Sequence, residues 1–186
     1  MTFPILQQPH KVLRRKAEEV PVDEIPSPKI QKILKDMALA LGEQDDGVAI
    51  ATPQIGVPLK IFVVSGKIFS KEFVRGKGVP EGTKDIPKDL VFINPKIIKL
   101  SKKKEYLLEG CLSCRWLYGE VLRRANATVE AYDQHGKKFR RGAGGFLAQI
   151  FQHEIDHLNG ILFIDKARNL QELPPESVNK AGKQVK

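Results

Sequence analysis

The chain has 186 residues, which is enough to bury a hydrophobic core and fits a single domain. Its 41% hydrophobic and 28% charged residues indicate a soluble globular protein. The longest uninterrupted apolar run, residues 37–41, is too short to cross a membrane, and the basic residues near the N-terminus leave no apolar core of a secretion signal. A membrane protein and a secreted protein are therefore not expected.

The formal net charge of +9 favours anionic surroundings such as nucleic acid, and the ribosome in particular. The basic residues are scattered, however, and no groove-reading motif is visible, so sequence-specific recognition of nucleic acid is not expected. The two cysteines, Cys111 and Cys114, are too few and too close together for a disulfide framework. They indicate a reducing compartment, and we expect a cytoplasmic protein.

The first half of the chain begins with a proline-rich arm and continues into a helix. Residues 1–26 contain four scattered prolines and are predicted to wrap the body as an extended arm. Ser27 is then a suitable N-cap and Pro28 a suitable first-turn residue, while Gly42 is placed to end the helix. Apolar residues between them recur on one face, which predicts a core-packing helix.

Residues 45–56 are apolar and rich in small side chains, so they predict either a groove wall or a buried strand and turn. Residues 65–89 are predicted as a loop or hairpin excursion. Alternating or short apolar runs predict strands at 59–64, 90–93, 97–100, 121–124, 127–132 and 138–140, with a possible closing strand at 161–164.

The order of helix, strands and then helix predicts an α+β fold. We expect mostly antiparallel sheets packed around a C-terminal metal-binding helix, with a second helix near the N-terminus. The catalytic domain is predicted to cover residues 1–165, and residues 166–186 are predicted to be a polar, proline-containing C-terminal tail.

The stretch with the strongest chemical signal lies in the predicted helix 145–158. His153 and His157 are four residues apart, so a helix presents both imidazoles on one face, where they can bind a divalent metal. Glu154 stands beside them and could move the protons of a metal-activated water. The alternative is two surface histidines on an amphipathic helix.

A catalytic metal site needs a third protein ligand. The sequence leaves several candidates, namely His10, His135, Glu172, Glu176 and Cys111. Glu172 or Glu176 would make the protein a zinc peptidase, whereas the thiolate of Cys111 is a good ligand for iron or zinc.

Three separated stretches resemble the signature motifs of one family. Residues 47–56, 109–113 and 152–160 are similar to the three motifs of peptide deformylase, in the same order and at similar spacing, and residues 5–20 resemble the family's opening segment. The resemblance covers about residues 3–165. It implies a metal-dependent hydrolase that removes the N-formyl group from the initiator formyl-methionine of newly made polypeptides and releases formate.

The resemblance also implies the roles of particular residues. By analogy, Cys111, His153 and His157 hold one divalent metal ion, and Glu154 is the acid/base. The Gln54 amide and the backbone N–H of Leu112 would stabilise the developing oxyanion. The family implies Fe(2+) as the native ion, and the donor set would also accept Zn(2+), Ni(2+) or Co(2+).

The substrate is expected to be a nascent N-formylmethionyl peptide that lies extended and adds as a strand. The predicted substrate-binding residues are Gly47, Val48, Ala49, Ile50 and Gly110. Ala49 and Thr52 stand where the family usually has glycine and alanine, and Cys114 stands where an apolar residue is usual. In a strand, Cys114 would point away from Cys111.

The methionine pocket is expected to include Val48, Leu147 and Ile150. A monomer that associates transiently with the ribosome is the expected state. Two alternatives remain at this point: a zinc-dependent peptidase of the HExxH type, and a catalytically degenerate basic protein of the ribosome.

Overall fold

The computed structural model describes residues 4–74 and 86–173. It contains two longer helices, α1 (Pro28–Gly42) and α3 (Gly145–Leu158), and a short helix α2 (Lys71–Val74). Turns of 3-10 helix lie at Lys11–Arg14, Val22–Glu24, Thr52–Ile55, Gly66–Phe69 and Phe163–Asp165. Among the described residues, no helix is long and apolar enough to span a membrane.

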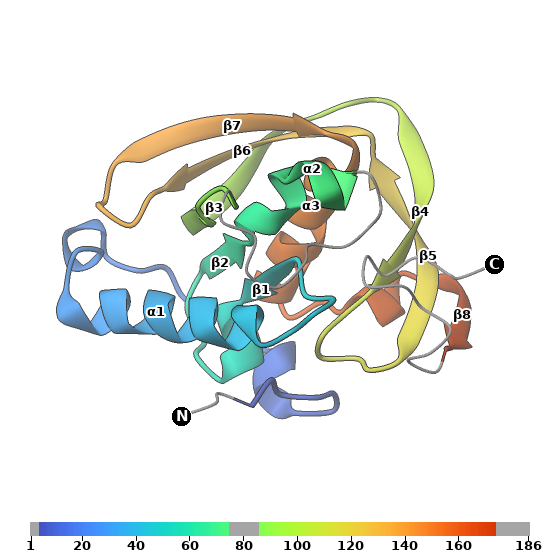
Figure 1. Cartoon of the computed structure of the whole chain (residues 1–186), viewed down its shortest axis with the longest axis horizontal. Coiled ribbons are helices and arrows are strands. Elements are labelled where there is room, and N and C mark those ends of the chain that lie inside the picture. Colours follow the sequence, from blue (N-terminus) through green and yellow to red (C-terminus); the bar gives the residue numbers. More distant parts are fainter. Residues whose placement is uncertain (1–3, 75–85, 174–186) are drawn as a thin grey trace.

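The strands form two antiparallel sheets (Figure 1). The five-stranded sheet contains, in spatial order, β1 (Ala49–Ala51), β2 (Ile61–Val64), β3 (Leu90–Leu100), β6 (Asn126–Tyr132) and β7 (Lys138–Gly144). The three-stranded sheet contains β4 (Lys104–Gly110), β5 (Leu117–Arg124) and β8 (Arg168–Glu172). The α+β fold expected from the sequence is confirmed.

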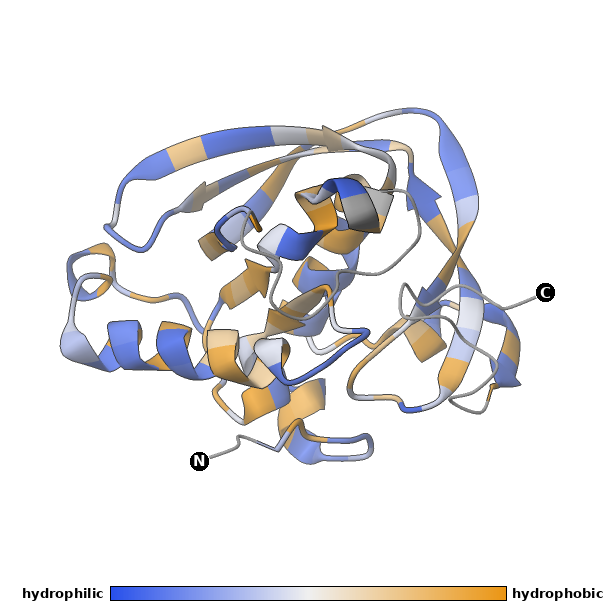
Figure 2. Ribbon diagram, in the orientation of Figure 1, coloured by the Kyte–Doolittle hydropathy of each residue, from blue (hydrophilic) through white to orange (hydrophobic). Residues whose placement is uncertain are grey.

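Both faces of the strands β1 and β2 are covered, and this explains why their sequences are continuously apolar. Successive side chains of a strand point to opposite faces. Phe62 and Val64 pack in the core that includes residues of α3, whereas Ile61 and Val63 pack in the core that includes residues of α1. Figure 2 shows hydrophobic ribbon concentrated where these strands lie between the two helices.

Aromatic rings pack between α3 and the larger sheet. The rings of Phe62 and Phe92 stack with their centroids 4.5 Å apart, and Phe151 of α3 meets Phe92 edge-on at 5.1 Å. All three side chains are fully buried. Aromatic pairs of this kind contribute about 0.5–1.5 kcal/mol beyond their buried area, so the helix that carries the two histidines is held against a rigid support.

The predicted start and end of the first helix are confirmed. The Ser27 hydroxyl accepts a hydrogen bond from the Ile30 N–H, Pro28 occupies the first turn, and the helix ends at Gly42. Its buried side chains, including Ile30 and Met37, lie on the face that packs against the sheet.

The interruption expected between 90–93 and 97–100 is wrong, because both runs belong to the single strand β3. Asn94 adopts a positive φ of 50°, and the register shifts between Ile93 and Lys96. Asparagine tolerates this conformation better than most residues. Its side chain also accepts from the Val20 N–H at 2.8 Å and donates to the Val20 carbonyl at 2.7 Å, which ties the N-terminal arm to the sheet.

The possible closing strand at 161–164 is also wrong. Phe163–Asp165 form a 3-10 turn, in which the Asp165 carboxylate accepts from the Leu162 N–H at 2.9 Å. The next strand, β8, comes later and pairs with β5, inside the segment predicted to be a tail. The division of the chain at residue 165 stays a prediction, since residues 174–186 lie outside the described part of the chain.

Gly160 ends α3 and offers a test of this packing. It has a φ of +73°, and a Cβ atom there would lie 2.5 Å from the Arg14 carbonyl oxygen. We expect Gly160→Ala to lower the free energy of unfolding by at least about 2 kcal/mol, because the backbone conformation and the contact both become unfavourable. Urea denaturation measures this.

Gly42 is the matched control, because a Cβ atom there meets nothing within 4 Å and no positive φ requires glycine. Gly42→Ala should change stability by no more than about 1 kcal/mol. Equal unfolding midpoints for the two variants would contradict the role given to Gly160.

Candidate metal centre

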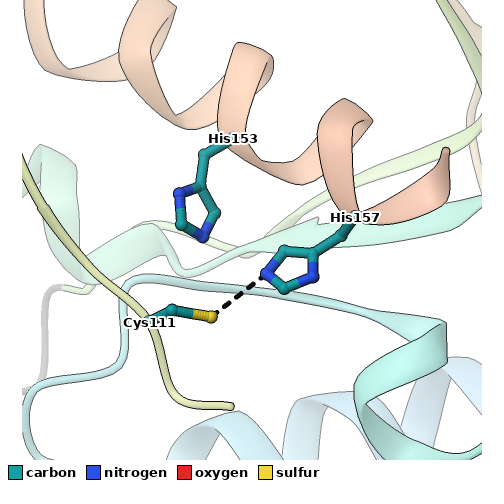
Figure 3. A group of neighbouring side chains, drawn as sticks. All are labelled: Cys111, His153 and His157. Carbon is teal, nitrogen blue, oxygen red and sulfur yellow. Dashed lines mark hydrogen bonds between the residues drawn. The ribbon is translucent and has the colours of Figure 1, made fainter. Parts of the chain in front are cut away.

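Helix α3 and the turn after β4 bring three possible metal ligands together. His153 and His157 project from successive turns of the helix toward Cys111, which directly follows the end of β4 (Figure 3). Their candidate ligand atoms all lie within 4.8 Å of one another, and Cys111 Sγ is 3.1 Å from His157 Nε2. Within residues 4–74 and 86–173 no second group of this kind occurs.

The other candidates for a third ligand are not part of this group. His10 is exposed and accepts a hydrogen bond from the Val12 N–H, and His135 is exposed in the turn between β6 and β7. Glu172 is exposed at the end of β8, and Glu176 lies outside the described residues. The peptidase alternative therefore lacks its third ligand in the described part of the chain.

His153 is oriented by a buried carboxylate. Its Nδ1 is 3.0 Å from Glu109 Oε2, so Nε2 is the nitrogen left to face the other two ligands. Arg123 in turn donates two hydrogen bonds to Glu109, at 2.7 and 2.9 Å, and one to Asp156 of α3 at 2.6 Å. A carboxylate behind a ligating histidine fixes its ring orientation and tautomer.

The charges of this network shift the pKa values of its members. Burial alone would raise the pKa of Glu109, but hydrogen bonds from Arg123 and His153 outweigh burial and lower it to about 2. Burial likewise would lower the pKa of His153, but the hydrogen bond and charge of Glu109 raise it. Glu109 is therefore an anion at neutral pH.

His157 and Cys111 can each supply a lone pair to a metal cation. Burial lowers the pKa of His157 well below its usual value, so the imidazole is neutral and keeps a lone pair for a metal. Contact with Cys114, together with burial, raises the pKa of the Cys111 thiol. A metal cation at the sulfur would favour the thiolate, so binding is expected to release a proton. Two imidazoles and a thiolate fit a tetrahedral divalent ion that keeps an open position.

Glu154 is buried beside this group and holds its proton unusually strongly. Its side chain lines the cavity, and burial raises the pKa to about 7. Its Oε2 has no hydrogen-bond partner in the described part of the chain. A carboxyl group with a pKa near neutrality can both take up and return a proton, which suits an acid/base role.

The Gln54 side chain is fixed near Cys111 by hydrogen bonds through both ends of its amide. Its Oε1 accepts from the Ala51 N–H at 2.8 Å, and its Nε2 donates to Ser113 Oγ at 3.1 Å and lies 3.7 Å from Cys111 Sγ. The Leu112 N–H has no acceptor among the described residues. The Gln54 amide and the Leu112 N–H are therefore two donors close to Cys111.

A cavity of about 260 Å³ opens over these residues. Of the residues predicted from the sequence, it is lined by Gly47, Val48, Ala49, Gln54, Gly110, Cys111, Leu112, Ile150, His153 and Glu154. Leu147 is not in the wall: it packs against the core beneath α3, and Phe146 and Gln149 line the cavity instead.

Ile50 needs a correction as well. Its side chain is fully buried in the core beside α1. In an antiparallel strand, the main-chain groups of successive residues point alternately toward the neighbouring strand and away from it. The Val48 carbonyl accepts from the Ser65 N–H, whereas the Ala51 N–H donates to Gln54. The main chain of Ile50 therefore points toward β2. The same alternation leaves the N–H and carbonyl of Ala49 at the free edge of the sheet, because β1 is an edge strand.

Two glycines of the predicted site are required by close packing. A Cβ atom on Gly47 would lie 2.8 Å from Gln44 Cβ and 3.3 Å from Leu112 Cδ1. A Cβ atom on Gly110 would lie 2.6 Å from the ring of Tyr118, its partner in β5. Glycine at these positions lets the cavity wall and the cysteine turn come close together.

Cys114 also lies elsewhere than predicted. Residues 111–114 form a turn rather than a strand, closed by a hydrogen bond from the Cys114 N–H to the Cys111 carbonyl at 3.0 Å. Cys111 and Cys114 both line the cavity. Cys114 does not belong to the group of possible metal ligands.

The sequence motifs do not indicate the residues behind the ligands. Glu109 belongs to one of the motifs, whereas no expected role falls on Arg123, Asp156 or Gln149. Arg123 carries no local signal, because it is one of many basic residues and only the fold shows that its side chain is buried. A carboxylate two positions before the motif cysteine was the available clue to Glu109.

Comparisons with known proteins agree with this geometry. The sequence model of the family described as polypeptide deformylase matches residues 2–173. A peptide deformylase of Desulforudis audaxviator is 37% identical over 168 residues, covering 90% of this chain and 95% of the relative. One from Roseiflexus castenholzii is 40% identical over 161 residues, covering 84% and 83%.

A solved structure of the class I type b peptide deformylase from Acinetobacter baumannii, with Met-Ala-Ser bound, is 28% identical with a TM-score of 0.75. The match covers 89% of this chain and 98% of that one. The fold and the cluster of ligands define a metal-dependent hydrolase. The chain belongs to the peptide deformylase family, and it removes the N-formyl group from nascent polypeptides.

The buried ion network behind His153 can be tested with Arg123→Met. The change leaves Glu109 buried without its main partner, and breaking a buried pair in this way costs about 3–5 kcal/mol. We expect that loss in urea denaturation and at least about tenfold weaker zinc binding, measured by competition with a chelator.

Arg140→Met is the control, since Arg140 forms an ion pair with Glu130 but its side chain is 70% exposed. It should change stability by less than about 1 kcal/mol and leave zinc binding unaltered. Zinc affinity that is equal in the two variants would argue against positioning through Glu109.

Proposed function

We propose that Cys111, His153 and His157 are the three protein ligands of the catalytic metal ion. The observation that carries the assignment is the convergence of their ligand atoms within 4.8 Å. Cys111 and His153 also line the cavity. Family membership supports it, because these residues stand in the stretches that resemble the deformylase motifs.

The ion is proposed to be Fe(2+) in the cell, with Zn(2+), Ni(2+) or Co(2+) able to occupy the same ligands in a purified sample. One thiolate and two imidazoles accept all four ions, so the donor set alone does not select among them. When bound, a divalent ion acts as a Lewis acid that polarises a carbonyl and lowers the pKa of water.

The residues around the ligands are proposed to complete the catalytic site. Glu154, with its pKa near 7, takes a proton from the attacking water and passes it to the leaving amine of the methionine. The Nε2 of Gln54 and the N–H of Leu112 donate hydrogen bonds to the oxyanion that develops on the formyl oxygen. Because Ala51 and Ser113 hold the Gln54 amide in advance, little reorganisation is needed when charge develops.

The nascent peptide is proposed to bind along the free edge of β1. The N–H and carbonyl of Ala49 face that edge, so an extended peptide can add to the sheet through main-chain hydrogen bonds. Gly47, Val48 and Gly110 border the same cavity. Recognition through the main chain suits an enzyme that must accept many sequences after the first methionine.

The cellular setting is proposed as follows. A net charge of +9 favours transient association with the anionic ribosome, where nascent peptides appear. The two free cysteines suit a reducing cytoplasm. We propose that the protein works there as a monomer.

Cys111→Ala tests the ligand assignment. Removing the thiolate should weaken zinc binding more than about 100-fold, because two imidazoles remain. Metal content is measured after anaerobic preparation and gel filtration, and formate release from a formyl-Met peptide is measured on the same sample. Cys114→Ala is the control and should keep its metal, and full metal content in Cys111→Ala would refute the assignment.

Glu154→Ala tests the acid/base role separately from metal binding. The variant should keep its metal, while kcat/KM for formate release falls by about 10²–10⁴-fold. Glu105→Ala, on the outer part of β4, is a control that should leave turnover unchanged. If metal-loaded Glu154→Ala turns over within about threefold of the unmodified chain, Glu154 is not the acid/base.

A further inference from the structure

The turn that supplies the proposed cysteine ligand carries a second thiol with no part in the mechanism above. Cys111 and Cys114 are the two cysteines of the chain, and both are free thiols. They line the same cavity. A buried second thiol beside a metal ligand can be a small core residue, or it can react with the first thiol.

The backbone geometry allows the two sulfur atoms to bond. The hydrogen bond from the Cys114 N–H to the Cys111 carbonyl, at 3.0 Å, closes a reverse turn with the cysteines at its two ends. Such a turn keeps the end Cα atoms within about 7 Å, and a disulfide needs about 4.4–6.8 Å.

The surroundings restrict what Cys114 can react with. Its residue is 2% exposed, and it packs with Leu13 and Phe163 in a small core of its own. Cys111 is more accessible and faces the cavity that must admit a formylated peptide end. A small oxidant entering the cavity therefore meets the more exposed Cys111 first, and Cys114 is the second thiol that lines the same cavity.

We propose that Cys111 and Cys114 form a reversible thiol–disulfide modification site that removes the metal ligand under peroxide stress. The Cys111 sulfur attacks hydrogen peroxide, the O–O bond breaks, and a sulfenic acid and one water are formed. The Cys114 sulfur then attacks the sulfenic sulfur and displaces a second water, which leaves the Cys111–Cys114 disulfide. Two thiols are oxidised by two electrons and one peroxide is reduced.

Two consequences follow, both resting on the proposed role of Cys111 as a ligand. The disulfide sulfur is no longer a thiolate, so the metal is left with two imidazoles and is released. The disulfide also protects Cys111, because a sulfenic acid without a neighbouring thiol goes on to sulfinic acid, which ordinary thiols do not reverse. A dithiol such as dithiothreitol restores both thiols by exchange.

The test uses the full chain loaded with zinc, which has no redox chemistry of its own. After treatment with stoichiometric hydrogen peroxide, free thiols are alkylated and the protein is cut with trypsin. Cleavage after Lys104 and Arg115 gives one peptide, 105–115, that contains both cysteines. Zinc release is followed with a chromogenic indicator.

We expect the oxidised peptide to be about 2 Da lighter than its dithiol form, with one zinc released per disulfide formed. Dithiothreitol plus zinc should restore most of the starting formate release. In zinc-loaded Cys114→Ala we expect no such mass loss, oxygen added at Cys111, and recovery below about a tenth of that variant's own starting activity.

The proposal is overturned if the unmodified chain gains oxygen at Cys111 without forming the disulfide, or if Cys114→Ala recovers as fully as the unmodified chain. The peptide mapping on the unmodified chain decides the matter even if the variant fails to fold. A disulfide that forms while zinc stays bound would support the thiol pairing but refute Cys111 as a ligand, so the two proposals fail separately.

Discussion

The geometry of the site depends on the salt-bridge network around Arg123. This one guanidinium joins β5, where it originates, to Glu109 of β4 and Asp156 of α3. Burying these charges costs free energy that a well-packed apolar cluster would not, so the network is better explained by positioning than by stability. It sets Glu109 behind His153 and thereby directs the free nitrogen of that ring toward Cys111. The second sheet, the cysteine turn and α3 are joined through this contact.

The larger sheet provides the other half of the site by being covered on both faces and open at one edge. Residues of α1 and α3 bury the side chains of β1 and β2, so mainly the main-chain groups of Ala49 remain at this edge of the sheet, where the peptide is proposed to bind. Ala49 is only 6% exposed, and its methyl group packs in the core that includes residues of α3. The Thr52 hydroxyl, where the family usually has alanine, donates to the Leu59 carbonyl and stabilises the turn that carries Gln54.

The sequence predicted those elements whose signals are local. The cap at Ser27, the end of α1 at Gly42 and the helical spacing of His153 and His157 each depend on a few neighbouring residues, and the structure has them where expected. The strand predicted at 161–164 is wrong because a short apolar run is compatible with a buried turn as well as with a strand. In the structure Leu162 and Phe163 fill a small core with Leu13, and Asp165 closes the turn. Such a choice depends on contacts far along the chain.

By itself, the sequence determined the chemistry: two histidines at helical spacing, a glutamate between them, and motifs that identify the family. Only the tertiary structure shows that the ligand atoms of Cys111, His153 and His157 come together, because Cys111 is 42 residues before His153 and no local rule relates them. It also decided that Arg123 is buried, that Ile50 faces the core, and that Cys114 lies beside Cys111 in a turn. The physical reason is that burial and long-range pairing arise from how sheets and helices pack.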